Sequence, residues 1–396
     1  MATLPDREYV ALAYETTTGR VTREFPLAAE PTWDARLNDL GGGGVSCPLG
    51  NSDDWDQWLH EVARPYRYSI AVGLSGTPTD SPLLQAGPMT GYVPDEEPAQ
   101  GQLPNISFTF KGFWQLLMRR LLHANTWNPA TARITDSSAD LVINDSLPNI
   151  AINIAYHATS MVNRAGSTLP IDFPVLFPTD GNTRTYHGYD MISAGQRLQE
   201  LTQVDGGPDV VFQPYLTTSG GYRVVRHRML IGNPYLTQPG VPLRFDYRSN
   251  LVKVAVNGQG EDTSTTALVK GTGNENAQQY GYATDSSLTS QGWPLLDYVD
   301  SGHTSTLIQG SLDSWATADV ALLGNLPEQW KATVLTEVDG AARLGTYIPG
   351  HFVQYNILDH HWIPDGLYTW RLLGLARTGS TQKGTVEHVI QALGAY

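Results

Sequence analysis

The chain has a single cysteine, few basic side chains and no long apolar segment. Cys47 has no second cysteine to pair with, and one cysteine cannot build a cysteine-based zinc cage. No run of about 18 apolar residues occurs, and residues 1–20 lack the basic and apolar stretches of a signal peptide. The sequence therefore predicts a protein that is made in a cytoplasm and does not insert into a membrane.

Basic residues are scarce beside acidic ones. Lysine and arginine number 25 against 39 aspartates and glutamates, so the formal net charge is -14. Such a surface repels phosphate backbones, which disfavours nucleic-acid binding. It would suit a tube that DNA crosses without sticking, but we favour the simpler explanation that the acidity keeps the protein soluble. Arg223, Arg226 and Arg228 form a cluster too small for a nucleic-acid groove, and we expect them in interface or surface ion pairs.

The composition favours strands over helical bundles. Apolar residues make up 41% and charged residues 16%, which predicts a chain that folds throughout. Glycine (39), proline (25), tyrosine (19) and tryptophan (10) are plentiful, a mixture typical of strands with many turns. The predicted class is mainly β with α+β parts, divided into two to four domains.

The first predicted domain is a β-barrel over residues 1–112. Short apolar runs alternate there with turn residues, as in YVALAYETTTGRVTREFPL and ISFTFKGF. A short helix is expected in DDWDQWLHEVAR, with acidic residues at its start, and Gly41–Gly44 are expected to form a flexible turn.

Residues 113–240 are predicted to be an α+β middle section. Phe113, Leu117 and Leu121 recur every four residues, which predicts a helix in FWQLLMRRLLHA. A second helix is predicted in DMISAGQRLQELTQVDGG: Met191, Ala194, Leu198 and Leu201 share one face, and Ser193 with Gln196 fits a capping box. PDVVFQPYL and YRVVRHRMLIG flank a glycine-containing turn and predict a β-hairpin.

Residues 241–396 are predicted to form a second, related β-barrel with a polar and helical insertion at about 273–325. The period of two in residues 252–256 and 267–269 predicts an antiparallel strand pair. SLDSWATADVALLGN predicts a helix ending at Gly324, and the last strands are expected in HFVQYNIL, LYTWRLLGL and TVEHVIQAL. Pro364-Asp365-Gly366 predicts a turn between the first two of these strands.

No complete catalytic or ligand motif is present. Hydrolases often use two carboxylates, but the candidates here show no selective spacing; they are Asp34, Asp53, Asp54, Asp56, Glu96, Glu97 and Asp300. His360 and His361 are adjacent, so on a strand they would face opposite ways, and His60-Glu61 is not continued as HExxH. The sequence lacks G-x-S-x-G and a P-loop, and Cys47 has no indicated histidine partner. No catalytic residue, cofactor site or metal site is predicted.

Tryptophans are the strongest remaining signal of binding. Trp55, Trp58, Trp127, Trp293 and Trp362 could stack on sugars through their ring faces. Packing in a core or against another subunit explains large aromatics as well, and we favour that interpretation.

Three segments together resemble one family. GQRLQELTQVDGGPDVVFQPYL, DYRSNLVKVAVNGQG with TALVKGTG, and IPGHFVQYNILDHHWIPDGLYTWRLLGL are similar to segments of the minor tail proteins of long-tailed (siphovirus) phages of actinobacteria, of the baseplate hub type. The resemblance covers roughly residues 190–396, and its motifs carry no catalytic residue.

This resemblance implies a structural virion protein at the tail tip and not an enzyme. It implies two related β-barrels per chain and a homotrimer whose pseudo-sixfold ring joins the tail tube to the tip. Expected partners are the distal tail protein, the tape-measure protein and other minor tail proteins, with DNA crossing the lumen unbound. The alternatives are a hexameric distal tail protein, a glycan- or receptor-binding tail protein, and a tail-associated cell-wall hydrolase.

Overall fold

The structure is a computed structural model that describes residues 7–50, 52–95, 104–204, 206–258, 263–304, 306–324, 328–336, 342–379 and 384–391. The chain folds as two compact units, one comprising Met1–Lys253 with Ala332–Val389 and the other Val254–Lys331 with Ile390–Tyr396. It is mostly β, as the composition predicts, and most strands belong to one large, predominantly antiparallel sheet. In the described ranges, every helix is too short or too polar to cross a membrane.

The large sheet takes its strands from both ends of the chain. The N-terminal set consists of β1 (Tyr9–Glu15), β2 (Val21–Glu24), β3 (Thr32–Arg36), β4 (Gly42–Pro48), β5 (Tyr68–Leu74), β6 (Gln85–Asp95) and β7 (Asn105–Lys111). The C-terminal set consists of β13 (Leu243–Asp246), β14 (Leu251–Gly258), β18 (Glu328–Leu335), β19 (Phe352–Ile357), β20 (Gly366–Arg377) and β21 (Thr385–Gln391). Helix α1 (Asp53–Val62) follows β4, at the place where the sequence predicts a helix, and the Ser52 side chain caps its N-terminus.

The two sets of strands share one neighbour order. The N-terminal set runs β1-β5-β6-β7-β4-β3, with β2 added beside β1, and the C-terminal set runs β13-β19-β20-β21-β18-β14. Strands that occupy the same place in the two sheet orders also occupy the same place along the chain within their set. By this double correspondence, β6 matches β20 and β3 matches β14. The sets differ in that β1 and β5 are antiparallel whereas β13 and β19 are parallel.

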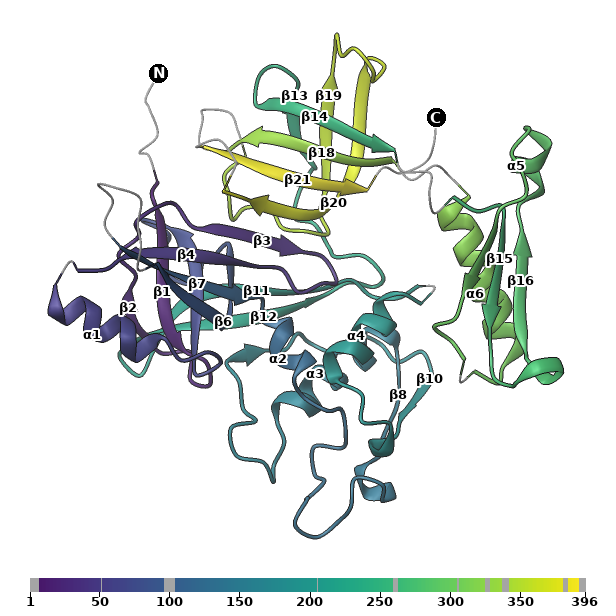
Figure 1. The fold of residues 1–396 in the computed structure, drawn as a ribbon, viewed down its shortest axis with the longest axis horizontal. Coiled ribbons are helices and arrows are strands. Elements are labelled where there is room, and N and C mark those ends of the chain that lie inside the picture. The colour runs from purple at the N-terminus through teal and green to yellow at the C-terminus, as the bar shows by residue number, and fades with distance from the viewer. Residues whose placement is uncertain are drawn as a thin grey trace. The chain divides into compact units, whose positions relative to one another are not determined.

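The two predicted β-barrels are not closed in the structure. Among the described strands, β2, β13 and β14 are the ends of the hydrogen-bonded order of the large sheet, and no two of them pair with each other. Strand β3 pairs with β4 along one edge and with β20 along the other (Figure 1). In the pair with β20, Trp33 lies opposite Arg377 and Arg36 opposite Gly374. A strand has only two edges, so the edge of β3 that could close an N-terminal barrel is occupied by the C-terminal set.

The middle of the chain combines helices with short strands. Its elements are α2 (Trp114–Met118), β8 (Leu141–Asp145), α3 (Leu147–Thr159), β9 (Ile171–Asp172), β10 (Asn182–Tyr186), α4 (Ala194–Thr202), β11 (Val210–Ser219) and β12 (Tyr222–Ile231), with 3-10 turns at Ser137–Ala139 and Gly188–Asp190. Strands β11 and β12 form the predicted hairpin. Its turn residues Gly220 and Gly221 both have positive φ, which a tight hairpin turn requires and glycine adopts without strain.

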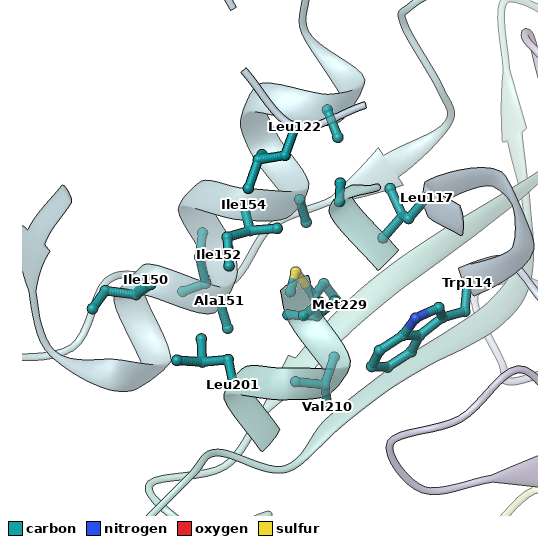
Figure 2. Packing of buried hydrophobic residues seen from close by; sticks show 14 of the residues in the cluster. Trp114, Leu117, Leu122, Ile150, Ala151, Ile152, Ile154, Leu201, Val210 and Met229 are labelled. Atoms are coloured by element: carbon teal, nitrogen blue, oxygen red, sulfur yellow. The ribbon is translucent and has the colours of Figure 1, made fainter. Parts of the chain in front are cut away.

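One apolar core holds these helices against the hairpin. Trp114 and Leu117 of α2, Ile154 of α3, Leu201 of α4 and Met229 of β12 converge in it (Figure 2). The indole N–H of Trp114 donates to the carbonyl oxygen of Gly195 over 3.1 Å, which satisfies the one polar atom of that side chain inside the core.

The two helix predictions of the middle section differ in outcome. Helix α4 has the predicted cap, because the Ser193 side chain accepts a hydrogen bond from the Gln196 backbone N–H over 3.1 Å. Met191, expected on its apolar face, instead lies before the helix with a positive φ of 50° and is exposed. Helix α2 is shorter than its apolar spacing predicts. It ends at Met118, and Leu121 forms a β-bridge with Ser193.

The second compact unit has a small sheet and a core of its own. Its sheet runs β16 (Tyr280–Thr284), β15 (Thr266–Lys270), β17 (Asp297–Asp300), and its helices are α5 (Ser286–Ser290) and α6 (Gln309–Leu323), with a 3-10 turn at Glu275–Ala277. Helix α6 ends at Leu323 with Gly324 as its C-cap, in agreement with the predicted end. Its buried side chains Leu312, Ala316 and Val320 pack against Ala267 and Val269 of β15.

The predicted antiparallel pair of residues 252–256 with 267–269 is wrong. Strand β14 lies beside β18 at the end of the large sheet, whereas β15 pairs with β16 and β17. A period of two indicates that a segment is a strand with one buried face, but it does not select the strand's partner.

The glycine run Gly41–Gly44 is mainly strand and not the predicted flexible turn. Gly42, Gly43 and Gly44 pair with β3 on one side and with β7 on the other. A Cβ atom on Gly43 would lie 2.2 Å from the Thr32 carbonyl oxygen and 2.9 Å from the Phe110 ring. The missing side chain therefore lets Phe110 and the backbone of β3 approach within the sheet.

Replacing Gly43 with alanine should lower the free energy of unfolding by about 2 kcal/mol or more, because the added methyl group displaces strand backbone. Urea denaturation of the purified chain measures this change. Gly379→Ala is the matched control, since its added Cβ meets no atom within 4 Å. That variant should unfold within about 0.5 kcal/mol of the parent. Equal losses in the two variants would contradict the steric argument.

Candidate functional site

The N-terminal candidate carboxylates lie in separate local interactions. On β3, Asp34 accepts a hydrogen bond from Arg36 over 2.6 Å. On α1, Asp54 pairs with Arg23 over 2.9 Å. Asp56 accepts hydrogen bonds from the Gly50 backbone N–H, and Asp53 stands exposed in the first turn of the helix. These interactions fix turns and helix ends, where isolated acids commonly lie.

The remaining candidate carboxylates lie elsewhere. Asp300 is on β17 in the second unit, 3.2 Å from Nε2 of His303, whose ring stacks on Trp315. Burial and the neighbouring Asp300 raise the pKa of Asp319. The spacing of acidic residues in the sequence did not indicate that these two carboxylates are neighbours. Glu96 and Glu97 fall outside the described residues. Within the described ranges, no three histidine, cysteine or acidic side chains are grouped so as to hold a metal ion.

The single histidines and the cysteine have local roles. Nδ1 of His360 accepts hydrogen bonds from the backbone N–H groups of Trp362 and Ile363, so it shapes the turn between β19 and β20. His361 and His60 are exposed. Cys47 is buried in β4, and burial raises the pKa of its thiol to about 12. A thiol with that pKa stays protonated near neutral pH and is a poor nucleophile.

The tryptophans proposed as sugar platforms are dispersed. Trp55 and Trp58 meet edge to face on α1, and the guanidinium of Arg23 lies 3.6 Å from the Trp55 ring centroid. Trp127 is buried and donates its indole N–H to the Arg133 carbonyl oxygen. Among the five, only Trp362 is largely exposed to solvent (75%), and Trp293 in the second unit is half-buried. One exposed ring does not make a stacking groove.

The arginine cluster of β12 is bound within the chain. The Nε and Nη2 groups of Arg226 donate charge-assisted hydrogen bonds to both carboxylate oxygens of Asp172 on β9, the shortest measuring 2.5 Å, and the Tyr215 hydroxyl donates another. Burial alone would raise the pKa of Asp172, but these hydrogen bonds lower it below its ordinary value. Arg228 lies over the Tyr215 ring. Two of the three arginines therefore hold the hairpin and β9 together and are not laid out for a polyanion.

A buried histidine network was missed by the sequence reasoning. His388 of β21 is fully buried, with its Nε2 3.0 Å from the Tyr347 hydroxyl and its Nδ1 2.7 Å from the Tyr355 hydroxyl. Because a neutral imidazole has one donor and one acceptor nitrogen, one tyrosine donates to the ring and the other accepts. Burial lowers the pKa of His388 to about 3. The only sequence signal was a histidine at an inward position of the alternating segment TVEHVIQ.

A buried ion pair was also missed. Arg371 of β20 pairs with Asp209, which precedes β11, and both side chains are almost fully buried. Asp209 also accepts a hydrogen bond from the Leu236 backbone N–H over 2.9 Å. A buried charge costs much free energy unless it is paired and hydrogen-bonded, so this pair fixes the middle section against the C-terminal set.

Open strand edges are the candidate functional surface that the fold provides. Among the described strands, β14 ends the large sheet, and it exposes Val252 and Lys253. The far end of β6 pairs with β7 along one edge only, and it exposes Tyr92 (45%) and Val93 (67%). Unpaired edges with exposed apolar side chains invite pairing with another chain.

Acid should weaken the fold through His388. Its pKa is about 3 when folded and about 6.5 when unfolded, so the unfolded state binds more protons as the pH falls through that interval. Stability is complete above pH 6.5 and declines below it, by about 2 kcal/mol from this residue between pH 7 and pH 5. His388→Gln should be less stable at pH 7 but lose about 2 kcal/mol less over the same interval, measured by urea denaturation at each pH.

The exposed His361 offers the matched control, and His361→Gln should keep the parent's dependence on pH. If the His388 variant also kept it unchanged, the assignment of this acid sensitivity to the buried ring would fail.

Comparison with known proteins identifies the fold. No protein-family model matches the chain, and no curated protein matches it by sequence. The 43 kDa tail protein of prophage MuSo2 from Shewanella oneidensis matches with a TM-score of 0.57 and 10% identity, over 98% of this chain and 96% of that one. The tail protein from Neisseria meningitidis MC58 matches with a TM-score of 0.54 and 11% identity, over 98% and 97%. The chain therefore has the fold of these tail proteins.

Proposed function

We propose that the chain is a structural protein of a phage tail tip, in which three copies form a baseplate hub. The observation that carries this proposal is the match to two tail proteins over 98% of the chain, so that the whole molecule, and not one domain, has their fold. The hub joins the tail tube to the tip and surrounds the path of the tape-measure protein and DNA. Its phage belongs to the long-tailed phages of actinobacteria that the sequence resembles.

The internal repetition of strand order supports three copies. If the N-terminal and C-terminal sets are related barrel-like domains, each chain presents two similar surfaces, and three chains present six. A ring with three copies can then match a tube of sixfold symmetry. In this proposal residues 1–112 and 241–396 are the two related domains, residues 113–240 the α+β section between them, and about 273–325 an insertion in the second domain.

The charge of the chain fits a channel for DNA. With 39 acidic against 25 basic residues, a ring of these chains would carry few sites for phosphate groups. The clustered arginines of β12 support the same conclusion, since Arg226 is already paired with Asp172 and Arg228 lies on Tyr215. Contacts with the distal tail protein, the tape-measure protein and other minor tail proteins would form around this ring in the virion, after assembly in the host cytoplasm.

The alternative functions have weaker support. A glycan-binding protein needs aromatic rings grouped on the surface, and of the five candidate tryptophans only Trp55 and Trp58 share an element, helix α1. A hydrolase needs two facing carboxylates, and four of the described candidates, Asp34, Asp54, Asp56 and Asp300, contact local partners instead of one another. A distal tail protein differs from a hub in symmetry, because it would form a hexamer.

Reconstruction of intact tails by electron microscopy tests the proposal. We expect three copies of this chain in a ring at the tail tip, with a neutral or acidic lumen. Six copies would assign the distal tail role instead, and a lumen lined with lysine and arginine would contradict the unbound passage of DNA. Absence of the chain from purified virions, or its hydrolysis of purified host cell wall, would refute a purely structural role.

A further inference from the structure

The junction between the two strand sets has a defined construction. Along one edge, β20 first pairs with β19, as far as Arg371 opposite Phe352, and then with β3, from Gly374 onward. A backbone hydrogen bond from Leu37 to the Leu373 carbonyl oxygen extends this junction, and Arg377 at the end of β20 pairs with Glu30 just before β3. The antiparallel direction sets the end of β20 against the start of β3.

Within the described strands, the counterparts of these two strands each have one unpaired edge at the same places. β6 corresponds to β20, and it pairs with β5 as far as Pro88 opposite Ser69. On β20, the residues that pair with β3, Gly374–Arg377, begin three residues after Arg371. On β6, the residues at the same spacing after Pro88 are Gly91–Pro94. β14 corresponds to β3, and within the described strands it pairs only with β18. Each strand set therefore contributes one strand to the β3–β20 junction and has one further strand, β6 or β14, whose corresponding edge is open among the described strands.

We propose that β14 of one copy pairs antiparallel with residues 91–93 of β6 in a second copy, repeating between chains the junction that β3 and β20 make within a chain. This inference rests on the proposed function, because it names the surfaces through which the hub closes. The interface is heterologous, one edge meeting a different edge, so successive copies either close a ring or continue as a filament. Pro94 has no N–H to donate, which restricts the new ladder to the residues before it.

Charge and apolar surface fit this pairing. The antiparallel direction brings the end of β6, with the exposed Asp95, near the start of β14, with the exposed Lys253. The intrachain junction has its own ion pair at the corresponding end, with the signs reversed: Arg377 on β20 and Glu30 before β3. Val93 and Val252, 67% and 44% exposed, lie on the two edges that would meet, so the new strand pair would also cover apolar surface.

Paired cysteines test the contact directly. Two double variants each place one thiol on β6 and one on β14. Both carry Val93→Cys, and the second substitution is Val252→Cys in one and Lys253→Cys in the other, so that both faces of β14 are sampled. Under mild oxidation we expect one of these double variants to give linked dimers and trimers, separated by denaturing electrophoresis. Each single variant should remain monomeric there, because a heterologous contact does not bring a residue near its own copy, and the native Cys47 is buried. Val93→Cys with Val142→Cys is the control, since Val142 is also exposed but lies on β8.

The experiment is run on the purified chain and on tails assembled with each variant. Cross-links in neither preparation, equal cross-linking in the single variants, or a ladder that continues beyond the trimer would overturn the proposed pairing. If tails contain three copies at the tip but only non-specific links, the pairing is wrong and the proposed function stands. If the purified chain forms the specific link but the chain is missing from virions, the proposed function fails and the pairing stands.

Exchange of the two charges gives a second measurement. Asp95→Lys and Lys253→Glu should each weaken trimer formation severalfold, measured by sedimentation at low salt, and the double exchange should restore much of the loss. Single exchanges without effect, or a double exchange no better than the singles, would contradict the proposed register of the contact.

Discussion

The antiparallel pairing of β3 with β20 joins segments that lie more than three hundred residues apart in one continuous sheet. Loop-closure entropy opposes so distant a contact, so it must be held by more than its backbone hydrogen bonds. Arg377 supplies part of this stabilisation, through its ion pair with Glu30 and its hydrogen bond to the Pro31 carbonyl oxygen. Arg371, further back on β20, pairs with the buried Asp209 and so fastens the middle section to the same strand.

This junction also explains why the N-terminal strand set does not close into a barrel. Closure of the N-terminal set would need the outer edge of β3, which β20 occupies. The cost is that β14 and the far end of β6 keep open edges, which proteins normally protect. A protein that works in an assembly can leave such edges for its own copies to cover, and the shared strand order supplies a pattern for how they fit.

Three buried or partly buried polar groups of the first unit are held by neighbouring side chains. His388 is enclosed by two tyrosine hydroxyls, Asp172 by Arg226 and Tyr215, and Asp209 by Arg371. Both ring nitrogens of His388 are occupied by neighbours from the same core. Such satisfied groups favour one arrangement of the strands, because another register would leave them buried without partners.

Local patterns in the sequence determined the local elements. The Ser193–Gln196 cap, the hairpin around Gly220 and Gly221, the helix that ends at Gly324 and the Pro364–Gly366 turn all follow from short-range rules of spacing and backbone preference. The tertiary structure alone decided which strands pair. Residues 252–256 and 267–269 show the same period of two, yet they enter different sheets, and Gly42–Gly44 form a strand because β3 and β7 enclose them. The open edges of the candidate interface could not be predicted from the sequence for the same reason. Strand periodicity indicates which face of a strand is buried, whereas the partner on each edge is bound through backbone groups that every sequence shares.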